Sequence, residues 1–235
     1  MFTYQINNPN DFVIENENYN VIPFGHRCTS ALACKYANMR KYSLPFDWTI
    51  PLFPGKTQKI LHSNFAEFIP DVHNNIFKNM YGVELAHFNE NKTDGINEYK
   101  RRIERFNSVI NEPKKIYFIY INDDYLYDNK YRTINFNDRI FNEMLNLEKF
   151  LRTKYTNINY NILYFNFKKD DIPQNSNIIN IVLSTDTFYN SWPSDYSVVS
   201  NFRNYCGKIL SELFNTKYDG NGHHNDWLIN SYFQD

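Results

Sequence analysis

The sequence predicts an α/β fold, namely a single three-layer domain with a mostly parallel sheet flanked by helices. Apolar runs alternate with amphipathic helical patterns along the chain, which is typical of a parallel sheet covered on both faces. The segment 115–121 is almost continuously apolar, as in a strand buried on both faces. The chain has 235 residues, of which 42% are hydrophobic and 18% aromatic. This is enough for one full core, so we expect residues 1–235 to form one domain.

The individual elements follow from local patterns. Strands are expected at 19–25, 115–121, 160–165 and 178–183. Helices are expected at about 29–39, after Pro54, and over 96–110, 135–155 and 195–214. Pro45 disfavours helix at Leu44, so the segment 42–48 is expected to be extended or a turn. We expect the four strands to be neighbours, mainly parallel, with a functional crevice at their carboxyl ends.

Charge and cysteine content limit the partners and the compartment. A net charge of −1 argues against general electrostatic binding to nucleic acid or to a membrane surface. No apolar stretch is long enough to span a bilayer. Three cysteines without paired spacing, and a start without a signal-peptide pattern, favour a reducing cytoplasmic location. No cofactor is implied.

Cys28 is the residue most indicative of chemistry. It lies where the first strand meets the first helix, and the free N–H groups of a helix start favour thiolate over thiol. Gly25 permits a tight exit from the strand. The alternative is that Cys28 packs as a small apolar residue, which we expect for Cys34 and Cys206 in their apolar helical stripes.

A second polar segment, 122–124, follows the strand 115–121, so its carboxylates fall at the same sheet edge as Cys28 if the two strands are neighbours. Asp123 and Asp124 have three interpretations: an orienting carboxylate for a histidine, a pair of metal ligands, or a solvated loop. No paired Cys or His spacing indicates structural zinc.

Four blocks resemble a known family: Val21-Ile-Pro-Phe-Gly-His-Arg-Cys-Thr-Ser-Ala31, Tyr42-Ser-Leu-Pro-Phe-Asp-Trp48, Ala86-His-Phe88 and Tyr99-Lys-Arg-Arg-Ile-Glu-Arg-Phe106. In order and spacing they resemble the putative papain-like cysteine peptidase family of bacteria and large DNA viruses. The resemblance implies Cys28 as nucleophile and His87 as its base, with Asp47 and Trp48 in the central block. A viral source would place the protein in the host cytoplasm.

The chain pattern differs from that of papain itself. Papain-like enzymes follow their cysteine helix with an antiparallel, barrel-like half, whereas strands and helices alternate here. A strand–nucleophile–helix junction on a parallel sheet is closer to serine esterases of the Gly-Asp-Ser type, with cysteine in place of serine. His26 and Arg27 stand where the family has small or polar residues.

These observations predict a cysteine hydrolase or acyltransferase acting on an ester, amide or peptide. Cys28 attacks a carbonyl, His87 accepts the thiol proton, and Asp47 or Asp123 orients the imidazole. His223, in a polar cluster near the end of the sequence, is the alternative base. The residues expected to contact substrate are His26, Arg27, Trp48 and His223.

Two other functions stay open. One is a nucleotide-sugar-dependent glycosyltransferase or another glycan-modifying enzyme, in which Asp123 and Asp124 bind a metal-diphosphate and Arg101, Arg102, Arg105 or Lys115 meets phosphate. The other is a non-catalytic binding protein that uses Trp48, Trp192 and Trp227 at an interface. The expected ligand is a small molecule, a glycan or a peptide, and the sequence does not fix the oligomeric state.

Overall fold

A five-stranded, mostly parallel sheet forms the centre of the fold. The computed structural model describes residues 4–7, 14, 18–25, 27–71, 78–85, 92–123, 134–184 and 196–220. The sheet consists of β1 (Tyr4–Asn7), β2 (Tyr19–Phe24), β5 (Lys115–Ile121), β6 (Tyr160–Asn166) and β7 (Ile178–Leu183), in the order β1-β7-β6-β5-β2. Strands β2, β5, β6 and β7 are parallel to one another, and β1 is antiparallel to β7. The prediction of four neighbouring, mainly parallel strands is confirmed.

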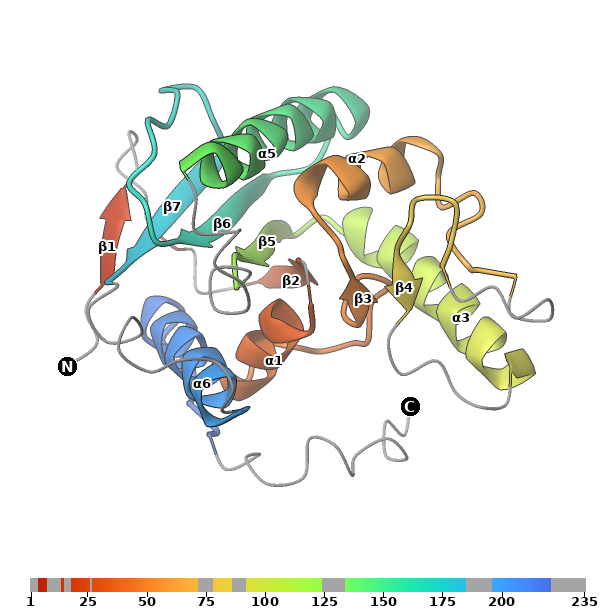
Figure 1. The fold of residues 1–235 in the computed structure, drawn as a ribbon, viewed down its shortest axis with the longest axis horizontal. Helices are drawn as coiled ribbons and strands as arrows, with labels where there is room; N and C mark the ends of the chain where they lie inside the picture. The colour runs from red at the N-terminus through yellow and green to blue at the C-terminus, as the bar shows by residue number, and fades with distance from the viewer. Residues whose placement is uncertain are drawn as a thin grey trace.

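Helices cover both faces of this sheet (Figure 1). On one face α1 (Thr29–Tyr36) packs against α6 (Tyr196–Leu213). On the other face α2 (Pro54–His62) packs against α5 (Ile134–Lys154), and α3 (Lys92–Ile110) joins the same apolar cluster. The predicted α/β class with helices on both faces is therefore confirmed, and the described residues form no barrel.

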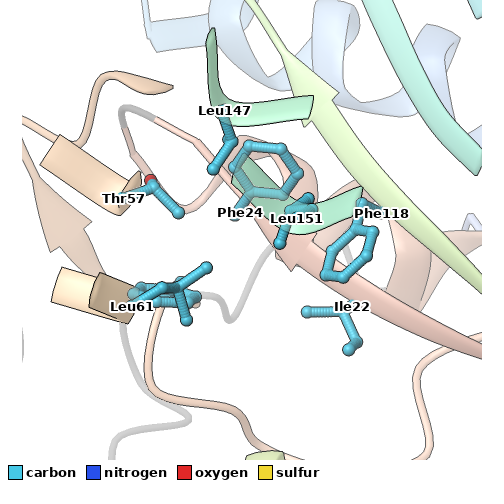
Figure 2. A pocket seen from close by; sticks show the side chains of 8 residues that line it. Ile22, Phe24, Thr57, Leu61, Phe118, Leu147 and Leu151 are labelled. Atoms are coloured by element: carbon cyan, nitrogen blue, oxygen red, sulfur yellow. The ribbon is translucent and has the colours of Figure 1, made fainter. Parts of the chain in front are cut away.

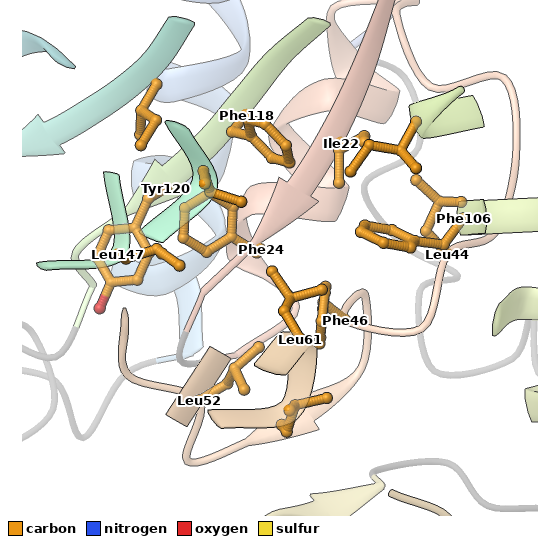
Figure 3. Packing of buried hydrophobic residues seen from close by; sticks show 14 of the residues in the cluster. Ile22, Phe24, Leu44, Phe46, Leu52, Leu61, Phe106, Phe118, Tyr120 and Leu147 are labelled. Carbon is orange, nitrogen blue, oxygen red and sulfur yellow. The ribbon is translucent and has the colours of Figure 1, made fainter. Parts of the chain in front are cut away.

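Alternating strand residues divide the core into two apolar clusters. Phe118 and Tyr120 of β5 point towards α2, α3 and α5, where they pack with Phe24 and Leu147 (Figure 3). The intervening residues of β5, such as Ile119, point towards α1 and α6. Successive side chains of a strand point to opposite faces of the sheet, and both faces are buried here. This explains why the sequence of β5 is apolar almost throughout.

Two prolines lie at positions where the fold needs no main-chain N–H donor. Pro23 lies in β2, an edge strand of the sheet, where a missing ladder hydrogen bond is tolerated. Pro54 begins α2, where the first N–H groups of a helix have no partner within it.

Two features were not predicted. One is β1, and the other is a small antiparallel sheet of β3 (Thr49–Ile50) and β4 (Glu84–Leu85). Strands of two to four residues are too short to show a hydrophobic period. Within the described ranges, no helix is both long and apolar enough to cross a membrane.

Candidate active site

The β2–α1 junction fixes Cys28 at the carboxyl edge of the sheet. Cys28 is the residue before the first turn of α1, and its carbonyl accepts the hydrogen bond from Leu32 N at 2.9 Å. The junction is tied to β5 because Ile121 N donates to Ser30 Oγ at 3.1 Å. A Cβ atom on Gly25 would lie 2.9 Å from that Ser30 oxygen. Only glycine at position 25 leaves room for the Ser30 side chain to come this close to the main chain.

A buried hydrogen-bonded network surrounds the Cys28 sulfur. Arg203 of α6 donates from Nη2 to Cys28 Sγ at 3.0 Å and from Nε to Thr29 Oγ1 at 3.2 Å. The Thr29 hydroxyl in turn donates to Asp123 Oδ2. Asp123 is fully buried, and Arg203 is 6% exposed, whereas Cys28 is partly exposed. The thiol is thus the point at which this network meets the surface.

Strand order brings Cys28 and Asp123 together. β2 and β5 are adjacent and parallel, with Phe24 paired to Tyr120. Asp123 continues the set of β5 positions that point towards α1 and α6, so its side chain reaches the start of α1. Asn122 belongs to the opposite set, and its side chain donates to Asn166 Oδ1 at 3.5 Å.

Opposing charges act on the Cys28 thiol. Burial raises its pKa above the ordinary value, the Arg203 guanidinium lowers it, and the Asp123 carboxylate raises it. The charge of Arg27 lowers the pKa further, which places Arg27 near the thiol. Burial outweighs the lowering effects of the two arginines and of a main-chain hydrogen bond, so the pKa of the Cys28 thiol is raised overall.

The other two thiols lie in the apolar core, as expected. Cys34 and Cys206 are fully buried, and burial raises the pKa of both. All three cysteines are free. Cys28 differs in being partly exposed and in contacting a cation.

The sequence interpretation missed Arg203 and Thr29. The missed signal was a charge within an apolar helical stripe, since Arg203 lies four residues after Val199 and three before Cys206. A buried arginine on the core side of an amphipathic helix requires a specific partner.

Asp47 lies in a different set of contacts. Its carboxylate accepts hydrogen bonds from Leu44 N at 3.0 Å and from Arg40 Nε at 3.1 Å, and Arg40 Nη2 pairs with the same oxygen. Trp48 is partly exposed, with the Arg40 guanidinium 5.8 Å from its ring centre. These contacts hold the segment 40–48 in shape.

Several predicted site residues cannot be placed. His26, His87, Asp124 and His223 lie outside the described residues. Trp192 and Trp227 lie outside them as well. The pairing of Cys28 with a base therefore stays a prediction.

The arginines of α3 differ in exposure. Arg101 is exposed, but Arg102 is buried, pairs with Glu98 and stacks on Tyr99, with its guanidinium carbon 4.7 Å from the ring centre. In the described part of the chain, no group of three His, Cys, Asp or Glu residues is arranged to hold a metal ion.

An apolar cavity of about 10 Å³ lies on the other face of the sheet (Figure 2). It is lined by residues of β2, β5, α2 and α5, among them Phe24, Phe118, Leu61 and Leu147. A space of this size hardly admits one water molecule. It is a packing gap in the core and offers no room for a substrate.

Comparison with protein families gives one match. Residues 55–170 match the model of the putative papain-like cysteine peptidase family. The resemblance inferred from the sequence is thereby confirmed over that segment, and the match supports a cysteine hydrolase at the level of class. His87 and Asp123 fall inside the matched segment, whereas Cys28, Asp47 and Trp48 precede it. Comparison with curated proteins and with solved structures gives no match.

This papain-like family label does not describe the topology. The described residues form a mostly parallel sheet between helices, with the cysteine between a strand and a helix at the sheet edge. Such an edge is where open α/β sheets bind their ligands.

Proposed function

We propose that this protein is a cysteine-dependent hydrolase or acyltransferase in which Cys28 attacks the carbonyl of an ester, amide or peptide. The observation that carries the proposal is the contact of the partly exposed Cys28 sulfur with Arg203 at the sheet edge. The family match, whose description names a cysteine peptidase, supports the same class.

In the proposed reaction the Cys28 thiol transfers its proton to a base as its sulfur bonds to the carbonyl carbon. The carbonyl electrons move to oxygen, and main-chain N–H groups at the start of α1 are suited to stabilise this oxyanion. Collapse of the tetrahedral intermediate breaks the bond to the alcohol or amine, which takes the proton from the base. Water then hydrolyses the thioester, or an acceptor hydroxyl or amine takes the acyl group.

The proposed base is His87, with His223 as the alternative. Because burial raises the pKa of the Cys28 thiol, most of the resting protein holds a neutral thiol near pH 7. A base that removes the proton during attack is therefore needed. Asp47 and Asp123 stay the candidates for a carboxylate that orients it, and His26, Arg27 and Trp48 for contacts to substrate.

Trapping of an acyl-enzyme tests the proposal. The protein is incubated with p-nitrophenyl acetate, an acetyl thioester and a peptide anilide, and is then quenched in acid for peptide mass spectrometry. We expect an acyl group on Cys28 with at least one donor and turnover that disappears in Cys28→Ala. Turnover should persist in Cys34→Ala, which removes a thiol distant from the sheet edge. Undiminished turnover in Cys28→Ala, or no acylation of Cys28 by any donor, would overturn the proposal.

A further inference from the structure

Arg203 occupies a position that apolar packing alone does not explain. It lies in α6 between Val199 and Cys206, on the side of the helix that packs against α1 and the sheet. An apolar side chain would fill this position without the cost of burying a guanidinium. The partners that the guanidinium reaches therefore account for it.

Those partners are two consecutive residues of the site. Nε and Nη2 belong to one edge of the planar guanidinium, and they donate to Thr29 Oγ1 at 3.2 Å and to Cys28 Sγ at 3.0 Å. A two-pronged contact fixes direction as well as distance. Lysine carries its N–H donors on a single nitrogen and cannot reproduce this planar contact from two nitrogens.

Thr29 connects the guanidinium to a negative charge. A hydroxyl has one proton to donate, and Thr29 donates it to Asp123 Oδ2, so its lone pair remains for Arg203 Nε. The direction of the chain Arg203–Thr29–Asp123 is therefore defined. These hydrogen bonds join α6, α1 and the end of β5 beside the Cys28 sulfur.

We propose that Arg203 is a positioning residue that aims the Cys28 sulfur and compensates its charge as the thiolate forms, with Thr29 and Asp123 holding the guanidinium in place. The inference rests on the proposed function in taking Cys28 as the nucleophile. It adds the group that makes a thiolate tolerable in this partly buried position.

The charged groups around the sulfur predict opposite effects for two substitutions. Arg203 from α6 and Arg27 from the junction favour the thiolate, while Asp123 from the end of β5 opposes it. Cys206 of α6 also faces Asp123 but is a neutral, buried thiol. Loss of Arg203 should therefore suppress thiolate formation, and loss of the Asp123 charge should promote it.

The test is the pH dependence of Cys28 alkylation, followed by peptide mass spectrometry on the folded protein with iodoacetamide. Cys28 should react faster than Cys34 and Cys206. In Arg203→Met the midpoint should move to higher pH by a unit or more, with alkylation at pH 7.5 slower by about tenfold. Arg203→Lys should restore part of the rate, because it keeps the charge but loses the two-pronged contact.

Two further variants complete the design. Asp123→Asn should move the midpoint to lower pH, and Lys208→Met, which removes an exposed cation from the same helix, should leave it unchanged. An unshifted midpoint in a folded Arg203→Met protein would overturn the inference. If Arg203→Met does not fold, Arg203→Gln, which keeps a polar side chain without the charge, decides, and an unshifted midpoint there rejects the inference. The assay requires no turnover, so a failure of the proposed acyl transfer is recognised separately.

Discussion

Arg203 Nη2 lies 3.0 Å from Cys28 Sγ, although the two residues are 175 positions apart in the sequence. The contact depends on the packing of α6 against α1, which are the last and the first helix of the described residues. A shift of α6 would therefore change both the direction and the charge environment of the sulfur. This gives a helix outside the matched family segment a direct connection to the proposed chemistry.

Asp47 should prove to be a structural carboxylate. It is 1% exposed, and Arg40, whose charge it compensates, is nearly buried as well. Asp47→Asn removes the carboxylate charge that pairs with this guanidinium, so we expect the free energy of unfolding to fall by about 3 kcal/mol. Urea unfolding measures the change.

The alkylation midpoint of Cys28 should stay the same in Asp47→Asn, because Asp47 contacts Arg40 and Leu44. Asp219→Asn, at an exposed position, serves as control and should keep the wild-type stability. Unchanged stability together with lost acyl transfer in Asp47→Asn would instead identify Asp47 as the carboxylate that orients the base.

Gly25 should be indispensable for the junction. In Gly25→Ala the new methyl group would meet Ser30 Oγ at 2.9 Å and displace the hydroxyl that accepts from Ile121 N. We expect a loss of about 1–3 kcal/mol in urea unfolding and a changed alkylation rate at Cys28. Gly55→Ala is the matched control, since its methyl group would meet the Glu143 side chain at 3.1 Å, a slightly longer distance, in an element away from the junction. Equal effects of the two substitutions would show that the junction adjusts freely.

Arg102 is the place to test phosphate binding by α3. Its Nε and Nη1 atoms are buried without a hydrogen-bond partner among the described residues, and Glu98, with which it forms an ion pair, is partly exposed. A buried pair of this kind is often no better than an apolar side chain of similar size. Arg102→Met should therefore match or exceed the wild-type free energy of unfolding, measured in urea, with Arg101→Met as the exposed control. A large loss of activity at unchanged stability would favour the glycan-transferase alternative.

Local patterns predicted the elements well because each depends on neighbouring residues. The bounds of β5 agree at both ends, and the first helix begins at Thr29 as expected. The approach of Asp123 to the Cys28 site followed from strand order, which the alternation of elements only suggested. The role of Arg203 was not predictable, because it depends on which face of α6 packs onto α1. Asp47 stays a site prediction, and its contact with Arg40, seven positions away, was not anticipated.

Asp170 should make the stability of the protein depend on pH. It follows β6, is 3% exposed, and accepts a hydrogen bond from Asn166 Nδ2 at 2.9 Å. Burial raises its pKa from 3.8 to about 6, against the opposing effects of Asn166 and Lys168. The folded protein therefore binds this proton more tightly than the unfolded chain does. Between about pH 4 and pH 6 the free energy of unfolding should fall as pH rises, by on the order of 3 kcal/mol in total.

The Asp170→Asn variant isolates this contribution, because asparagine keeps an acceptor for Asn166 and cannot ionise. The quantity to compare is the difference in free energy of unfolding between variant and wild type, measured in urea from pH 4.5 to pH 7.5. We expect the variant to gain relative to the wild type as pH rises and the difference to level off above pH 6. Asp219→Asn, at an exposed position after α6, should show a constant difference near zero. A pH-independent difference for Asp170→Asn would mean that this carboxyl titrates alike in the folded and unfolded states, and that water reaches it despite its burial.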